Sequence, residues 1–204
     1  PYFYQKFEII FNYIINEKKF SISSSELFRI FKNSKRMLLL LLEKKFIIPD
    51  NLILKQIFEM KDQNNYDYSA YLYLGIKPYL NEAQQKKIEK YISTKYDGNL
   101  ELFFKMCQIG ENHSYICSLI RNDSIEEFIT YINQTNYPLS SKITKSIFET
   151  NSFLIGKKPN LIEYAAFFGS IQIIQYLNLN NAKLRNRLFY YSIHSNNPDV
   201  IHFC

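Results

Sequence analysis

The sequence predicts an all-α fold of helix–turn–helix units arranged as an α-solenoid. Apolar residues recur every three to four positions over most of the 204 residues, which is the spacing of one helix face. Five Gly and six Pro are too few turn-forming residues for a sheet of many strands. The third observation is the stretch from Asn160 to Ala182, NLIEYAAFFGSIQIIQYLNLNNA, which is typical of two short helices separated by a tight break.

The break in this stretch falls at Gly169, where we expect a left-handed residue that other side chains resist. Ala165 and Ala166 precede it, and their methyl groups allow two helices to approach closely. Ser170 is expected to cap the second helix. The apolar face of that helix is formed by Ile173, Ile174 and Leu177.

The sequence predicts two domains. Residues 1–110 form a helical N-terminal domain, and residues 111–204, which include the stretch just described, form degenerate ankyrin-like helix–turn–helix repeats. The expected helices of the first domain run from Tyr2 to Glu17, Glu26 to Lys32, Lys35 to Lys45, Asp50 to Phe58, Glu82 to Ser93 and Leu100 to Ile109. We expect Asn81 to cap the fifth of these helices and Gly110 to end the sixth. Ser23 and Glu26 form a capping-box pattern. Between Lys61 and Tyr79 we expect a polar, Tyr-rich loop and a short helix stopped by Gly75 and Pro78.

In the second domain the expected helices run from His113 to Arg121, Ile125 to Asn133 and Pro138 to Phe148, followed by an extended link from Phe153 to Lys158. The helix pairs recur at uneven offsets. Phe128 is equivalent to Ile173 when the sequence is shifted by 45 residues, and Val200 is equivalent to Ile173 when it is shifted by 27 residues.

The pattern around Gly169 resembles an ankyrin repeat, in which a period of about 33 residues is usual. The resemblance lies in the Ala-Ala pair, the Gly, the Ile-Ile pair and Leu177, which is separated from Ala182 by four residues. The chain departs from it at Asn160–Glu163, which stands where Thr-Pro-Leu-His is usual. A well-formed hairpin between repeats is therefore not expected.

A wider resemblance covers most of the chain and is most specific after Gly110. SYICSLIRNDSIEEFITYI, ITKSIFETNSFL, LIEYAAFFGSIQIIQYL and SELFRIFKNSKRMLLLLLEKK are together similar to an uncharacterised helical domain that leads into ankyrin repeats in large protist protein families. This resemblance implies a scaffold or adaptor for protein–protein interaction, without enzymatic activity. It also implies further ankyrin repeats after Cys204, so we expect the array to be truncated there.

The composition is compatible with a cytoplasmic protein. Three Cys give no paired disulfide framework, and the longest apolar run, Met37–Leu42, is too short to cross a bilayer. No secretory signal is visible, and the missing initiator Met suggests a piece of a longer protein. The formal net charge of +6 permits contact with acidic partners.

The candidate chemical sites are weak. Cys107, His113 and Cys117 lie in one stretch, but structural zinc needs four ligands, and Cys117 falls on an apolar helix face. No Gly-rich phosphate loop or nucleophile with an orienting base is present. We therefore expect no enzyme, metal or cofactor.

The candidate partner contacts lie on the concave side expected of a solenoid. They are Lys157, Lys158, Phe167, Phe168, His194 and Ser195, with packing between helices as the competing interpretation of the Phe pair. The alternative function is a basic scaffold in which the Lys86–Lys95 helix binds nucleic acid or an anionic membrane. No nucleic-acid motif accompanies these lysines, so the interaction module is the leading hypothesis.

Overall fold

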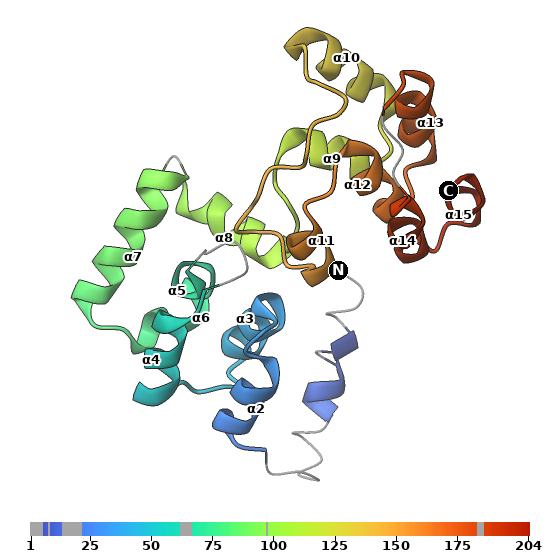
Figure 1. Cartoon of the computed structure of the whole chain (residues 1–204). Helices are drawn as coiled ribbons and strands as arrows, with labels where there is room; N and C mark the ends of the chain where they lie inside the picture. The colour runs from blue at the N-terminus through green and yellow to red at the C-terminus, as the bar shows by residue number, and fades with distance from the viewer. Residues whose placement is uncertain (1–5, 8, 14–21, 62–66, 97, 183–185) are drawn as a thin grey trace. The chain divides into compact units, whose positions relative to one another are not determined.

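The computed structural model in Figure 1 describes residues 6, 7, 9–13, 22–61, 67–96, 98–182 and 186–204. Over these residues the all-α prediction is confirmed, because extended pairing is limited to isolated bridges between Lys61 and Asp67 and between Lys142 and Asn160. The chain divides into two compact units, Pro1–Glu111 and Asn112–Cys204.

The first unit is a cluster of short helices. They are α2 (Ser24–Phe31), α3 (Lys35–Glu43), α4 (Asn51–Glu59), α5 (Tyr68–Tyr71), α6 (Tyr73–Ile76), the 3₁₀ helix η1 (Lys77–Tyr79), α7 (Glu82–Lys95) and α8 (Leu100–Ile109). Residues 6, 7 and 9–13 are helical as well. Phe11 is buried there against Phe31 and Phe46, and the remainder of the predicted helix from Tyr2 to Glu17 lies outside the described residues.

Side-chain caps fix where several helices of this unit begin and end. Ser23 and Glu26 form the predicted capping box at α2, and Asn81 forms a second one with Gln84 at α7. Gly110 ends α8, as the sequence predicts, and it does so in the left-handed conformation, with φ 76°. These caps satisfy N–H and C=O groups that have no partner inside the helix.

Gly75 does not stop a helix, contrary to the prediction, because it lies inside α6. A Cβ placed on it would lie 2.6 Å from the Cβ of Leu42, so α6 can approach α3 only where no side chain is present. Pro78 lies in η1, which follows α6 directly.

The second unit contains three helix pairs. The first is α9 (Tyr115–Arg121) with α10 (Ile125–Thr135), the second is α12 (Leu161–Phe168) with α13 (Ile171–Leu179), and the third is α14 (Leu188–Ser192), continued by η2 (Ile193–Ser195), with α15 (Pro198–Phe203). We call α9, α12 and α14 the inner helices. α12 contacts both of the others and lies between them in Figure 1.

The connection before α12 differs from the prediction in two places. Residues between Pro138 and Phe148 form turns and no helix. The predicted extended link is helical instead, as α11 (Ser152–Lys157). Polar side chains explain the first difference: the amide of Asn112 donates to the carbonyl of Thr144 at 2.8 Å, and Ser146 Oγ accepts from the N–H of Phe148 at 3.2 Å. Such bonds offer the backbone an alternative to a helix.

Each helix pair has a left-handed residue at its turn. These residues are Asp123, Gly169 and Asn196, with φ of 49°, 80° and 53°. The offset between the last two is 196 − 169 = 27 residues, as predicted, but the first two are 169 − 123 = 46 apart, which is one more than the predicted 45.

Ser170 stands at the N-cap of α13 but makes no side-chain cap. Its hydroxyl donates to the carbonyl of Ile120 instead. The cap comes from the preceding turn, where the Asp123 carboxylate accepts from the N–H groups of Gln172 and Ile173 at 3.1 and 3.0 Å. The turn of one pair therefore completes the helix of the next.

The Asn160–Glu163 segment closes the start of α12 by a capping box in which each side chain accepts from the backbone N–H of the other residue at 2.9 Å. Glu163 is fully buried, and Arg187 forms a two-pronged ion pair with it at 2.6 and 3.0 Å. The bridge between Lys142 and Asn160 lies at the same point, so only a trace of a hairpin precedes α12.

Candidate binding site

The predicted partner contacts come from three segments of the second unit. Lys157 and Lys158 end α11, Phe167 and Phe168 end α12, and His194 and Ser195 lie in η2. The structure brings two of them together, because the rings of Phe167 and His194 stack with centroids 5.0 Å apart.

Phe153 of α11 joins these two rings and was missed by the sequence reasoning. Its ring centroid lies 4.4 Å from that of His194, 5.0 Å from that of Tyr191 and 6.0 Å from that of Phe167. The sequence analysis assigned Phe153 to an extended link and therefore gave no reason to expect its ring contacts with His194 and Phe167. The signal that could have found it is Asn151, whose side chain caps α11 by accepting from the N–H groups of Phe153 and Leu154.

The aromatic residues at this site differ in how much of each side chain is exposed to solvent. Phe167 is buried, Phe153 and Phe168 are half-buried, and His194 is exposed. The Phe168 ring packs on Tyr164 at 4.8 Å, with the Arg121 guanidinium 6.0 Å from its centroid. Phe167 is therefore part of the packing, whereas Phe168 and His194 present ring surface to solvent.

The polar residues at this site likewise include both exposed side chains and one that serves the local structure. Lys157 and Lys158 are exposed, and Lys157 follows Phe153 by four residues, so both lie on one side of α11. Ser195 has a role within the turn, because its Oγ donates to the Ser192 carbonyl at 2.6 Å and accepts from Asn197 N–H at 3.1 Å. We define the inner-helix surface as Phe153, Lys157, Phe168 and His194.

A buried polar layer supports this surface. Arg121 Nη1 donates to the carbonyl of Asn112 at 2.8 Å and to the Tyr164 hydroxyl at 3.0 Å. Burial raises the pKa of the Tyr164 hydroxyl and of the Glu149 carboxyl. Glu149 accepts from Asn151 N–H at 2.9 Å, so it holds the residue that caps α11.

The residues considered for a metal do not form a site. Cys107 belongs to the first unit, and burial raises its thiol pKa. His113 Nδ1 lies 3.1 Å from Ser146 Oγ, and burial lowers the His113 pKa. Across the described part of the chain, no three His, Cys, Asp or Glu side chains lie close enough to hold a metal ion.

The first unit offers an open groove of about 510 Å³ between α4 and the start of α7. Leu54, Phe58 and Tyr79 contribute apolar surface to it. Asn81 and Gln84 also line it, but each already accepts a backbone N–H of the other in the capping box. The start of α7 therefore has little capacity left for an anion.

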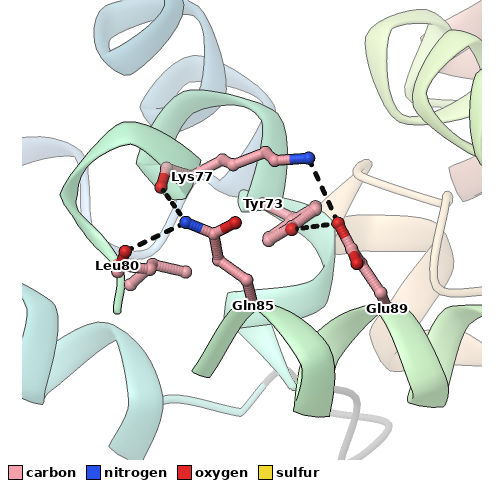
Figure 2. Close-up of polar contacts among 5 residues, drawn as sticks. All are labelled: Tyr73, Lys77, Leu80, Gln85 and Glu89. Atoms are coloured by element: carbon pink, nitrogen blue, oxygen red, sulfur yellow. Dashed lines mark hydrogen bonds and ion pairs between the residues drawn. The ribbon is translucent and has the colours of Figure 1, made fainter. Parts of the chain in front are cut away.

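The basic helix is α7, and Figure 2 shows how it is attached to the preceding helices. Glu89 accepts from the Tyr73 hydroxyl at 2.5 Å and from Lys77 Nζ at 3.1 Å. Gln85 Nε2 donates to the carbonyls of Lys77 and Leu80 at 3.2 and 3.0 Å. Both side chains point toward the rest of the unit (Figure 2).

The consequence is an unneutralised basic surface, which we define as Lys86, Lys87 and Lys90. All three are exposed, and none forms an ion pair with another described residue. The Tyr73 and Lys77 bonds lower the pKa of Glu89, so its charge is retained at neutral pH, but it is directed at Lys77 rather than at these lysines.

Comparison of the chain with known protein families, curated proteins and solved structures found no match. The described helices include none that is long and apolar enough to cross a membrane. The functional argument therefore rests on the surfaces described above.

Proposed function

We propose that this chain is a non-catalytic protein–protein interaction module, whose partner binds the inner-helix surface of the second unit. The observation that carries this proposal is the convergence of α11, α12 and η2. They present Phe153, Lys157, Phe168 and His194 over the buried ring of Phe167. Aromatic side chains held rigidly in this way are typical anchors of protein interfaces.

The wider proposal is that the second unit is the start of an ankyrin-like solenoid in a cytoplasmic adaptor. Three features support it: left-handed turns at Asp123, Gly169 and Asn196, the position of α12 between α9 and α14, and the trace of a hairpin before α12. A stack of such units exposes one long surface of inner helices, which is where these proteins bind partners.

The charges around the surface indicate the chemistry of the partner. Lys157 of the surface and the neighbouring Lys158 are exposed, and Arg121 lies over the ring of Phe168. Cations near exposed rings favour a partner segment that combines a carboxylate with an apolar or aromatic anchor. An acidic peptide segment with one large apolar side chain meets both requirements.

The test is capture of partners on the immobilised chain, followed by affinity measurement with each purified candidate. The double variant Phe168→Ala, His194→Ala should weaken binding at least tenfold, the range expected for interface anchors. The control is Leu179→Ser, since Leu179 is 80% exposed on α13 and lies outside the surface. Equal affinity for the double variant and the wild type, with unchanged circular dichroism, would exclude this surface.

A second candidate function, nucleic-acid binding by α7, is favoured by the inward direction of Glu89. Ala83, Ser93 and Thr94 are exposed on α7 near the three lysines. The exposed residues of α7 therefore include no large apolar side chain that could enter a bilayer, since Tyr91, four residues after Lys87, is half-buried, and we favour nucleic acid over an anionic membrane.

The second function predicts a salt dependence that can be measured by fluorescence anisotropy with a single-stranded oligonucleotide. Three phosphate contacts give a slope of about −2 for log K against log salt concentration. Lys86→Gln with Lys90→Gln should reduce that slope by about two thirds, and Lys55→Gln on α4 is the control. Anionic vesicles provide the membrane arm. A slope that does not change in the double variant would exclude α7 as the contact.

A further inference from the structure

The groove of the first unit, between α4 and the start of α7 (Figure 1), contains two aromatic rings that are open to solvent in part. Leu54 is buried beneath it, whereas Phe58 and Tyr79 are half-buried. Partly exposed rings that line one cavity give a surface on which another planar ring can stack. The volume of about 510 Å³ lies within the range of roughly 300–1,000 Å³ usual for small-ligand sites, so the groove is large enough for one nucleobase.

The polar side chains of the groove offer hydrogen-bond donors from α7 and acceptors from α4. The amide oxygens of Asn81 and Gln84 accept backbone N–H groups at 2.9 and 3.0 Å, which leaves the NH₂ group of each amide as a donor. No described residue accepts a hydrogen bond from either NH₂ group. The Glu59 carboxylate supplies acceptors from α4, and no other described residue bonds to it.

The groove carries one charge of each sign. Lys55 and Glu59 both line it from α4, and its other lining residues are uncharged. A groove without net charge does not attract a phosphate by itself, and its rings and amides do not require a charged ligand. A neutral planar ring with polar edges therefore fits the groove better than an anion does.

The basic surface of α7 begins one helical turn beyond the groove. Lys87 follows Gln84 by three residues and Lys90 follows Lys87 by three, so the three side chains lie in one row along the helix. The step from Gln84 to Lys87 is about 4.5 Å along the helix axis. A strand whose phosphates lie on the lysines can therefore place a neighbouring base at the groove.

We propose that the groove binds one unstacked base of a single-stranded nucleic acid whose phosphates lie on the basic surface of α7. The base stacks on Phe58 and Tyr79, its acceptor atoms receive hydrogen bonds from the two amides, and its exocyclic amine donates to Glu59. Cytosine and adenine offer both acceptors and an amine, whereas thymine has no amine. An apolar protein side chain in the groove would use neither the amides nor Glu59. This inference rests on the second candidate function, to which it adds the site of the base.

Single strands that differ only in their bases test the inference by fluorescence anisotropy. The strands are oligodeoxycytidine, oligothymidine and an abasic strand, each of about twelve nucleotides, within the usual site sizes of such proteins. The abasic strand should bind about 5–150-fold more weakly than oligodeoxycytidine, the range expected for stacking of one base on aromatic side chains. Both should show the same salt slope, because their phosphates are the same. Oligothymidine should bind more weakly than oligodeoxycytidine, because it offers Glu59 no amine.

The outcomes separate this inference from the function on which it rests. Equal affinities of the deoxycytidine and abasic strands, with the salt slope that Lys86→Gln and Lys90→Gln reduce, overturn the base site and leave nucleic-acid binding by α7 intact. That is the result expected if the groove holds a protein side chain instead. Absence of binding by every strand overturns both. Oligothymidine that binds as tightly as oligodeoxycytidine overturns the contact assigned to Glu59.

Variants then locate the base. Phe58→Leu with Tyr79→Leu replaces both rings by apolar side chains and should reduce the affinity for oligodeoxycytidine to that for the abasic strand, without changing the salt slope. Phe46→Leu is the control, because Phe46 is a half-buried ring of the same unit outside the groove. The inference is overturned if the double variant, with unchanged circular dichroism, keeps the full difference between the two strands, or if Phe46→Leu removes that difference. If the double variant does not fold, the comparison of the three strands on the wild type decides.

Discussion

Gly169→Ala should destabilise the second unit because Gly169 combines a left-handed backbone with close neighbours. Its φ is 80°, and an added Cβ would lie 3.3 Å from the Cβ of Asn197 and 3.4 Å from the Cβ of Ser195. The left-handed conformation costs a residue with a Cβ roughly 1–2 kcal/mol. Moving the Asn197 turn by a few tenths of an ångström adds to that, so we expect a total of about 1.5–3 kcal/mol.

A loss of about 2 kcal/mol corresponds to a decrease in Tm of about 8–16 °C for a unit of this size. The assay is thermal unfolding by circular dichroism, with hydrogen exchange to assign the change to residues of the second unit. Gly98→Ala is the matched control, because Gly98 also has a positive φ, 72°, but nothing within 4 Å of its added Cβ. Gly98→Ala should lower the Tm only by the amount due to the left-handed backbone, because its added Cβ meets no neighbouring atom. If Gly169→Ala lowers the Tm by no more than Gly98→Ala does, the packing of the last turn on Gly169 is refuted. A change within about 2 °C, below that expected for 1 kcal/mol, would contradict the left-handed conformation as well.

Three further outcomes follow from individual contacts. Gly75→Ala should cost about 1–3 kcal/mol in urea unfolding, because its Cβ would overlap that of Leu42; an unchanged midpoint would contradict the close approach. Arg187→Met leaves the buried Glu163 carboxylate without its cation. It should lower the free energy of unfolding, measured in urea, by about 3 kcal/mol, or by less where solvent reaches the site; an unchanged free energy would show that the ion pair does not stabilise the second unit. His113 has a lowered pKa because of burial, so its contribution to stability is complete above its ordinary pKa of 6.5 and is lost as pH falls through the lowered value. His113→Gln should therefore remove up to about 1.4 kcal/mol per pH unit of acid destabilisation, measured as urea midpoints between pH 7.5 and 5.5. Identical pH profiles for the variant and the wild type would refute it.

Local signals in the sequence were sufficient where a residue's own chemistry determines its conformation. The capping box at Ser23, the helix end at Gly110, the left-handed end at Gly169 and the Asn81 cap were all predicted correctly. In each case the side chain or its absence acts on the adjacent backbone, within about one helical turn.

The segment between Pro138 and Lys158 shows why the rest could not be predicted. Its conformation depends on Asn112, a side chain 32 residues from its partner Thr144, and on buried Glu149, which accepts from the residue that caps α11. Long-range bonds of this kind leave no periodic pattern. Phe153 could be assigned to the site only after α11 had been seen to hold it against His194.

The candidate site was predictable in the same uneven way. The sequence placed Phe167, Phe168 and His194 near one side of the inner helices but could not decide which were packed. Phe167 is buried, because Phe153 from outside the predicted helix pair stacks on it. The basic surface on α7 depended likewise on the direction of Glu89, and helical spacing alone does not show that it turns to Tyr73.

The cap that Asp123 provides to α13 has a consequence for how the second unit folds. The carboxylate reaches backbone N–H groups 49 and 50 residues further along the chain. The first turn of α13 therefore gains its hydrogen-bond partners only after the α9–α10 turn has formed, and loses them when that turn opens. Because starting a helix is its least favourable step, this contact couples the two pairs, so that they should open as one cooperative segment in native-state hydrogen exchange.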